Sequence, residues 1–202
     1  MVWEVIEGAG WPIWPLILTS VIGFAIIIER VWFLREEAII PADLSGLVDD
    51  MLAQGHVDRA QLQAVGEGSM LGDILTSVLN NEGRSLEHMK DAVEQIGENK
   101  KYELERYLGA LSTISTVAPL LGLFGTVIGM VELFSAFTLG STDVGAFGRG
   151  ISIALYNTAG GIVVAVPAMI GYRYFRSRVD FLLNRMEYYA NHLADLLSQA
   201  KG

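Results

Sequence analysis

The fold of this chain is decided by residues 108–139, LGALSTISTVAPLLGLFGTVIGMVELFSAFTL, and by residues 144–172, VGAFGRGISIALYNTAGGIVVAVPAMIGY. Each stretch holds one acidic or basic residue, Glu132 in the first and Arg149 in the second. A helix crosses a hydrocarbon core of roughly 30 Å with about 20 residues, so both stretches are long enough to span a bilayer. The sequence therefore predicts an all-α integral membrane protein.

A third apolar stretch lies near the start of the chain, where residues 11–28 carry no charge. The charges before it are Glu4 and Glu7, whereas a cleaved signal peptide has a basic stretch there, so we expect this segment to remain as an anchor. The expected organisation is an outer N-terminal segment (1–11), transmembrane helix 1 (12–34), a cytoplasmic helical region (35–110), transmembrane helix 2 (111–139), an outer loop (140–148), transmembrane helix 3 (149–173) and a cytoplasmic helical tail (174–202).

Charge sets the expected orientation. Of the 14 lysines and arginines, all but Arg149 lie at the inner ends of spans one and three, between spans one and two, or after span three. Basic residues are retained on the cytoplasmic side, which places the N-terminus outside. Trp3, Trp11, Trp14 and Trp32 flank span one as an aromatic belt would. The net charge of −9 argues against a nucleic-acid partner, and the absence of cysteine removes disulfides and thiolate chemistry.

The cytoplasmic region reads as short amphipathic helices. Apolar residues recur at helical spacing from Leu44 to Leu52 before Gly55, and again after Ser85, a plausible N-cap. No proline follows until Pro119, so this last helix is expected to run on into span two. Apolar residues also continue beyond span three, which predicts a long helix whose stripe needs partners in water. Long helices extending into the cytoplasm and a homo-oligomer are the expected result.

Small and hydroxyl residues mark the two long spans. Glycines at three- and four-residue steps let helix backbones approach closely, so tight helix packing is predicted for Gly122, Gly125, Gly129 and Gly161. Thr126 and Thr158 each lie near the centre of an apolar stretch, and the amide of Asn157 is costly in hydrocarbon without a partner. These three residues suggest a polar ring at mid-depth in the membrane. The alternative is that each threonine bonds its own helix backbone.

The string APLLGLFGTVIGM from Ala118, followed by GISIALYNTAGGIVVAVPA from Gly150, closely resembles the ExbB branch of the ExbB/TolQ/MotA proton-channel family. The resemblance covers essentially the whole chain. It implies a homopentamer whose helices surround a central pore holding an ExbD-like single-span partner, and that partner carries the titrating membrane aspartate. Thr126 and Thr158 match the family's pore-facing threonines, and Pro119 and Pro167 its prolines in spans two and three.

The resemblance further implies a multi-pass protein of a Gram-negative inner membrane, with a periplasmic N-terminus. Proton flow would then drive outer-membrane transport through a TonB-like protein. A TolQ-like role in envelope constriction and a MotA-like stator stay open, as does sodium in place of the proton. Since hydroxyls and amides do not titrate near neutral pH, we expect this chain alone to conduct protons poorly.

One position departs from the family pattern. Many members carry glutamate where this chain has Ile153. Glu132 is a possible replacement acidic station, since it lies about 9 Å outward of Thr126 and Ile153 about 7.5 Å outward of Thr158. On a straight helix, however, Glu132 points about 120° away from Thr126. The alternative is that Glu132 reaches the outer interface or pairs with Arg149.

An enzyme and a membrane scaffold are the two other classes of function to consider for this sequence. An enzyme is not expected, because no catalytic motif occurs, the three histidines lie in cytoplasmic segments, and neither a metal nor a cofactor site is indicated. A non-conducting membrane scaffold, in which the threonines merely pack, is the remaining competitor.

Overall fold

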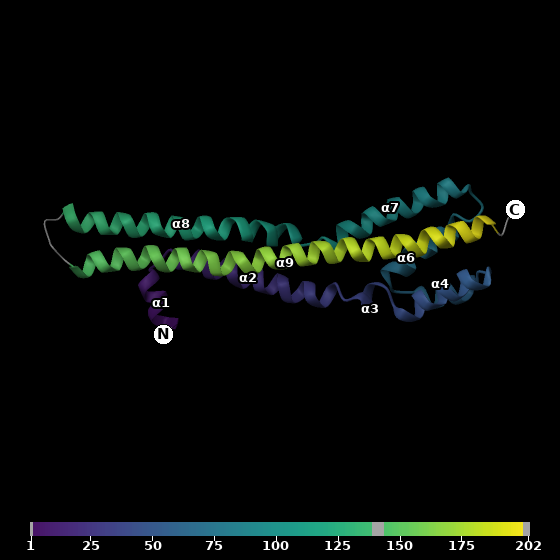
Figure 1. Ribbon diagram of the computed structural model, residues 1–202, viewed down its shortest axis with the longest axis horizontal. Coiled ribbons are helices and arrows are strands. Elements are labelled where there is room, and N and C mark those ends of the chain that lie inside the picture. The colour runs from purple at the N-terminus through teal and green to yellow at the C-terminus, as the bar shows by residue number, and fades with distance from the viewer. Residues whose placement is uncertain (1, 139–143, 200–202) are drawn as a thin grey trace. The chain divides into compact units, whose positions relative to one another are not determined.

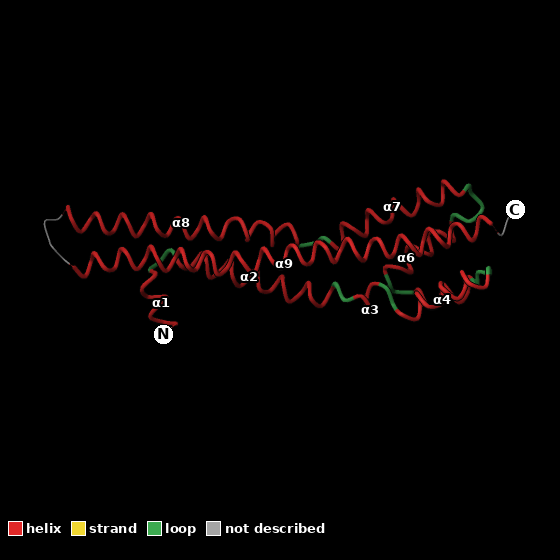
Figure 2. Tube along the Cα trace, viewed as in Figure 1, coloured by secondary structure: helices red, strands yellow, loops and turns green. Residues whose placement is uncertain are grey.

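The computed structural model describes residues 2–138 and 144–199, whose regular structure is helical (Figure 2). Stretches of three helices are long and apolar enough to cross a membrane: Ile13–Phe33, Leu108–Ser135 and Val144–Gln199. The chain is thus an all-α membrane protein. In order, the helices are α1 (Val2–Ala9), α2 (Ile13–Phe33), α3 (Glu36–Ile39), α4 (Ala42–Gln54), α5 (Arg59–Gly66), α6 (Met70–Asn80), α7 (Leu86–Leu104), α8 (Leu108–Thr138) and α9 (Val144–Gln199).

The chain divides into two compact units, and the first comprises Met1–Glu29 and Tyr107–Tyr174. It holds α1, most of α2, all of α8 and the first half of α9. Within it α8 and α9 lie side by side (Figure 1). A buried cluster fills the space where α1, α2, α8 and α9 meet, and its members are Ala9, Ile13, Leu16, Ala118 and Ala165.

Much of the apolar surface of this unit is exposed. In the most apolar stretch of each span, only 28% of the residues are buried in α8, 28% in α9 and 17% in α2. Leu120 is 59% exposed and Val163 is 71% exposed. Apolar surface of this extent is stable against lipid or against neighbouring helices, and not against water. The surface chemistry of the unit therefore agrees with a membrane location.

The second unit comprises Arg30–Arg106 and Phe175–Gly202 and is described up to residue 199. Some of its helix ends coincide with capping residues in the sequence. α4 ends before Gly55, which adopts a left-handed φ of 67°, and the Ser85 hydroxyl accepts a bond from the His88 backbone N–H at the start of α7. α5 and α6 meet where Gly66 and Gly72 are both buried and neither has a side chain.

Charged side chains hold this second unit together. Arg30 is 1% exposed, and its Nη1 donates to the Leu104 carbonyl at 3.0 Å, at the C-terminus of α7 where carbonyls lack helical partners. Glu36 forms ion pairs with Arg178, at 2.9 Å, and with Arg185. The hydrogen bond to the Tyr189 hydroxyl, followed by the charge of Glu36, raises the pKa of Arg185 above its ordinary value.

The helix that was expected to run from the cytoplasmic region into span two is interrupted, so that expectation is wrong. α7 ends at Leu104 and α8 begins at Leu108, so the helix does not continue from the cytoplasmic region into span two. Between them Tyr107 has a φ of +65°, a left-handed conformation that a helix cannot propagate. Residues 144–148, expected in the outer loop, form the first turns of α9, since no proline separates them from Arg149. Residues 140–143 of that loop lie outside the described part of the chain.

Candidate functional site

Gly122, Gly125 and Gly129 of α8 lie against α9 with almost no space between the helices. A Cβ atom placed on Gly122 would be 2.8 Å from the backbone oxygen of Asn157, and one on Gly161 would be 2.8 Å from the Ala118 oxygen. A Cβ on Gly125 would overlap the side chain of Asn157. Gly129 faces Gly150 in the same way. We call this contact of α8 and α9 the glycine seam. Any side chain at these positions would push the two helices apart.

The two mid-span threonines lie beside this seam. The Thr126 hydroxyl donates to the Leu123 carbonyl at 2.6 Å, and the Thr158 hydroxyl donates to the Ala154 carbonyl at 3.0 Å. Each hydroxyl proton is thus donated to a carbonyl of its own helix. The oxygen keeps lone pairs that can accept a hydrogen bond or ligate a cation. Thr158 is exposed and Thr126 is half-buried. Both oxygens belong to α-helices, which position them more rigidly than loops would.

The register of the seam fixes the relative depth of the two threonines. Gly122 packs against the Cα of Thr158, and Thr126 lies one helical turn further along α8. These four residues correspond to a rise of about 6 Å along the helix axis. The two hydroxyls are therefore near one another in depth, with an offset of at most about one turn.

Asn157 lies in a different environment from the threonines. It is fully buried, and its Nδ2 donates to the carbonyls of Ala9 and Ile153, both at 2.8 Å. Its Oδ1 accepts no hydrogen bond from the described residues. Within the subunit its amide faces the end of α1 rather than an open surface. The structure therefore places Thr126 and Thr158 on the two helices of the seam at similar depth, and it directs the amide of Asn157 to the interior of the subunit.

Glu132 and Ile153 face different directions. Glu132 is exposed on α8, next to Leu133, which is buried where α8 meets Gly150. Ile153 is 3% exposed and lies against Gly10, between α1 and α2. Although both residues are near the same ends of their spans, the carboxylate does not occupy the space next to Ile153.

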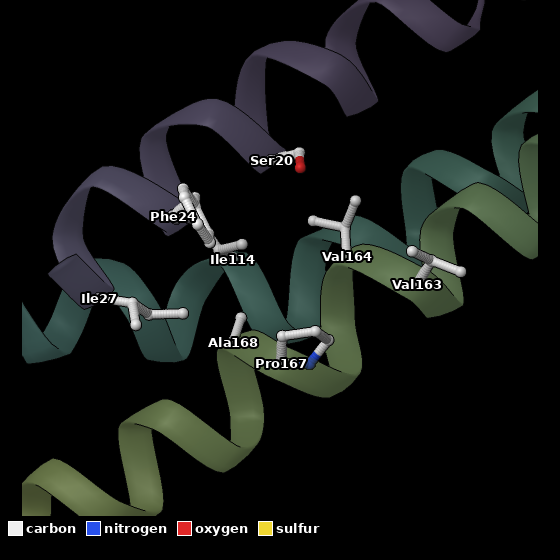
Figure 3. Close-up of a pocket in the computed structure, with 9 residues that line it drawn as sticks. Ser20, Phe24, Ile27, Ile114, Val163, Val164, Pro167 and Ala168 are labelled. Carbon is white, nitrogen blue, oxygen red and sulfur yellow. The ribbon is translucent and has the colours of Figure 1, made fainter. Parts of the chain in front are cut away.

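Pro119 and Pro167 lie inside α8 and α9. Each lacks the N–H that would bond the carbonyl four residues earlier, which loosens the helix locally. A pocket of about 90 Å³ adjoins Pro167 (Figure 3). Its lining is apolar apart from the Ser20 hydroxyl and consists of Ser20, Gly23, Phe24, Ile27, Ile114, Val163, Val164, Pro167 and Ala168. This lining suits hydrocarbon and offers no set of polar groups for an ion.

Sequence reasoning missed α1 and its contact with Asn157. The apolar residues Val2, Val5, Ile6 and Ala9 have the spacing of an amphipathic helix, so the helix itself was detectable. Its docking on α9 had no local signal, because 148 positions separate Ala9 from Asn157. For residues 2–138 and 144–199, no group of three or more histidine, aspartate or glutamate side chains could hold a metal ion.

Comparison with known proteins identifies a family. Residues 60–188 match the model of the MotA/TolQ/ExbB proton channel family. A putative biopolymer transport protein, ExbB homolog, of Methanothermobacter thermautotrophicus is 29% identical over 186 residues, which cover 91% of this chain and 66% of that protein. The putative biopolymer transport protein ExbB-like 3 of Synechocystis is 33% identical over 172 residues, or 81% of this chain and 79% of that protein.

A shorter match joins the chain to a second branch. The Tol-Pal system protein TolQ of Pseudomonas aeruginosa is 34% identical over 96 residues, which cover 47% of this chain and 42% of that protein. The matched region 60–188 contains both threonines and the whole glycine seam. Since the family model covers more than half of the chain, the chain belongs to the MotA/TolQ/ExbB proton channel family, and it is a channel-family membrane protein rather than an enzyme.

Proposed function

We propose that this chain is the multi-span subunit of an ExbB-type complex in a Gram-negative inner membrane. With an ExbD-like single-span partner it couples the proton motive force to TonB-dependent transport at the outer membrane. The N-terminus is periplasmic, and five copies surround the partner's helices. The names of the relatives, biopolymer transport proteins of the ExbB type, support this branch.

Thr158 carries this proposal. Its hydroxyl is exposed on the subunit in the middle of an apolar span, beside the glycine seam. Its proton is bonded to the Ala154 carbonyl, and the remaining lone pairs of its oxygen can accept hydrogen bonds from water in a hydrated pathway but not from lipid. In this proposal Thr126, on α8 next to Gly125 of the seam, provides a second hydroxyl to the pathway, while Asn157 is buried inside the subunit.

The pathway needs a titrating group that these residues do not provide. Threonine hydroxyls hold water but do not change charge near neutral pH. The partner's membrane aspartate supplies the missing group in our proposal. A proton crossing 100 mV releases about 2.3 kcal/mol, which is enough to shift packed helices past one another and too little to unfold a core.

The exposed apolar residues of the spans support an oligomer. A ring of copies would cover part of this surface and leave the Thr158 faces around a central space, which the partner's helices fill. The number of five subunits and the movement of the partner are taken from the family resemblance.

Proton leak into proteoliposomes tests this division of roles. The chain reconstituted alone is expected to leak protons no faster than empty vesicles, and the chain with its single-span partner is expected to leak measurably, as read by an internal pH-sensitive dye. A partner whose membrane aspartate is replaced by asparagine serves as the control and should return the leak to background. Strong conduction by the isolated chain would refute the proposal.

Glu132 is not needed in this mechanism. Ile153 is buried against Gly10 whereas Glu132 is exposed on α8, so Glu132 does not take the place of the family's glutamate, and we expect Glu132→Gln to leave energy-dependent uptake within about twofold of wild type. Uptake is measured in cells that lack the native subunit and carry the variant at equal abundance. A loss as large as that of the partner's aspartate variant would instead make Glu132 an acidic station.

A TolQ-like function is the second candidate, supported by the match to the Pseudomonas aeruginosa protein. The two candidates differ in phenotype. A strain without this chain loses TonB-dependent uptake under the first proposal and shows an envelope-constriction defect under the second.

A further inference from the structure

The fully buried amide of Asn157 joins two helices that are far apart in the sequence. Its Nδ2 donates to the carbonyl of Ala9, the last residue of α1, and to the carbonyl of Ile153 one turn earlier in α9. Carbonyls in the last turn of a helix have no partner within that helix. Asn157 therefore completes the C-terminal end of α1 with a donor supplied from α9.

The orientation of the amide follows from its partners. Both groups next to Nδ2 are carbonyl oxygens, which only accept, so the nitrogen must lie on that side. Oδ1 receives no hydrogen bond from the described residues, so burying this oxygen costs free energy. The two bonds donated by Nδ2 offset this cost. An apolar residue would fill the same space without that cost. The two donors are therefore the physical reason for an asparagine here.

The surroundings leave little freedom for α1 to move. A Cβ on Gly125 would overlap the Asn157 side chain, so α8 makes room for the amide. Gly8 lies against the ring of Tyr156, where a Cβ would approach to 2.8 Å. Trp11, just after α1, contacts the Phe124 ring edge-on with 5.9 Å between centroids. The turn after α1 is thus fitted to α8 and α9 on either side of Asn157.

We propose that Asn157 is a positioning residue that fastens α1 to α9 and thereby fixes the turn of α9 that presents Thr158. Thr158 is the next residue along α9, so a shift or rotation of this turn moves its hydroxyl. The effect on ion movement rests on the function proposed above. The fastening of α1 does not, and it can be measured separately.

The chain contains no cysteine, so a single introduced thiol can report on α1. A nitroxide attached at Val5→Cys, an exposed position on α1, is expected to be immobilised in the wild-type background and mobile with Asn157→Leu. Asn157→Asp, which keeps the size and offers one donor at most, should give an intermediate mobility. The same label at Leu18→Cys on α2 is the matched control and should not respond.

The functional effect of the same variants is measured as the proton leak of the complex with its partner. Asn157→Leu is expected to lower the leak about tenfold. Joining Gly8→Cys to Tyr156→Cys with a short bis-maleimide should restore the leak, because it ties α1 back to α9. If Asn157 only filled space, a covalent link between the neighbouring positions 8 and 156 would not restore the leak.

A second variant guards against a folding defect. In Gly125→Ala combined with Asn157→Gly, the seam keeps its close packing while the amide is gone, and α1 should again become mobile with the complex assembled. If the α1 label stays immobile both in Asn157→Leu and in the Gly125→Ala, Asn157→Gly double variant, Asn157 does not fasten α1. A mobile α1 with an unchanged leak, or a lost leak that the cross-link does not restore, would overturn the positioning of Thr158.

Discussion

Thr158→Val is expected to reduce energy-dependent uptake by about tenfold or more, which corresponds to ~1.4 kcal/mol or more of lost stabilisation along the ion pathway. Valine has nearly the shape of threonine but no hydroxyl, so the exposed face beside the glycine seam loses its oxygen and keeps its packing. The bond that Thr158 gives to the Ala154 carbonyl is local to one helix, and its loss should leave the subunit folded. The measurement is uptake in intact cells, together with the size of the purified complex.

Two controls separate the hydroxyl from the position. Thr158→Ser keeps the oxygen and should retain most of the uptake. Ser152→Ala removes a hydroxyl that makes the same kind of bond, to the Gly148 carbonyl, earlier on α9, and it should stay near wild type. Full uptake by an assembled Thr158→Val complex would favour the non-conducting scaffold over the channel.

Gly72→Ala is expected to destabilise the second unit by about 2–4 kcal/mol, despite the better helix propensity of alanine. The new methyl group would overlap the carbonyl oxygen of Gly66, and backbone atoms cannot swing aside as a flexible side chain can. Helix propensity alone would favour alanine by about 1 kcal/mol, so the sign of the change shows which effect is larger.

Gly46→Ala supplies the matched control. Gly46 lies inside α4, and a Cβ there would meet no atom within 4 Å. This variant should raise stability by up to about 1 kcal/mol, because only propensity changes. Far-UV circular dichroism during heating in detergent measures both variants. If Gly72→Ala melts at or above the wild-type temperature, the close approach of α5 and α6 is wrong.

Features determined within a few residues were accessible from the sequence. Long apolar runs indicate the spans, because a bilayer demands length and lack of charge. Ser85 and Gly55 mark a helix start and a helix end, because their side chain or its absence satisfies a local backbone requirement. In the same way, the three- and four-residue spacing of glycines pointed to α8 as a close-packing surface.

Features determined by tertiary contact were not accessible. Tyr107 adopts a left-handed conformation that its type disfavours, so neither propensity nor spacing indicates the end of α7. Asn157 was expected beside the threonines because it is polar and adjacent, whereas its amide is directed to Ala9. Which face of α9 meets α1 depends on helix packing across 148 positions, and periodicity contains no information on that choice.

The contact between Ala9 and Asn157 also orders the biogenesis of the subunit. The ribosome completes α1 long before it reaches residue 157, and the carbonyl at the end of α1 has no amide to meet until α9 has been translated and inserted. α1 therefore cannot make this contact until most of the polypeptide has been synthesised. Its attachment is a late event of maturation, and it distinguishes a finished subunit from a nascent one.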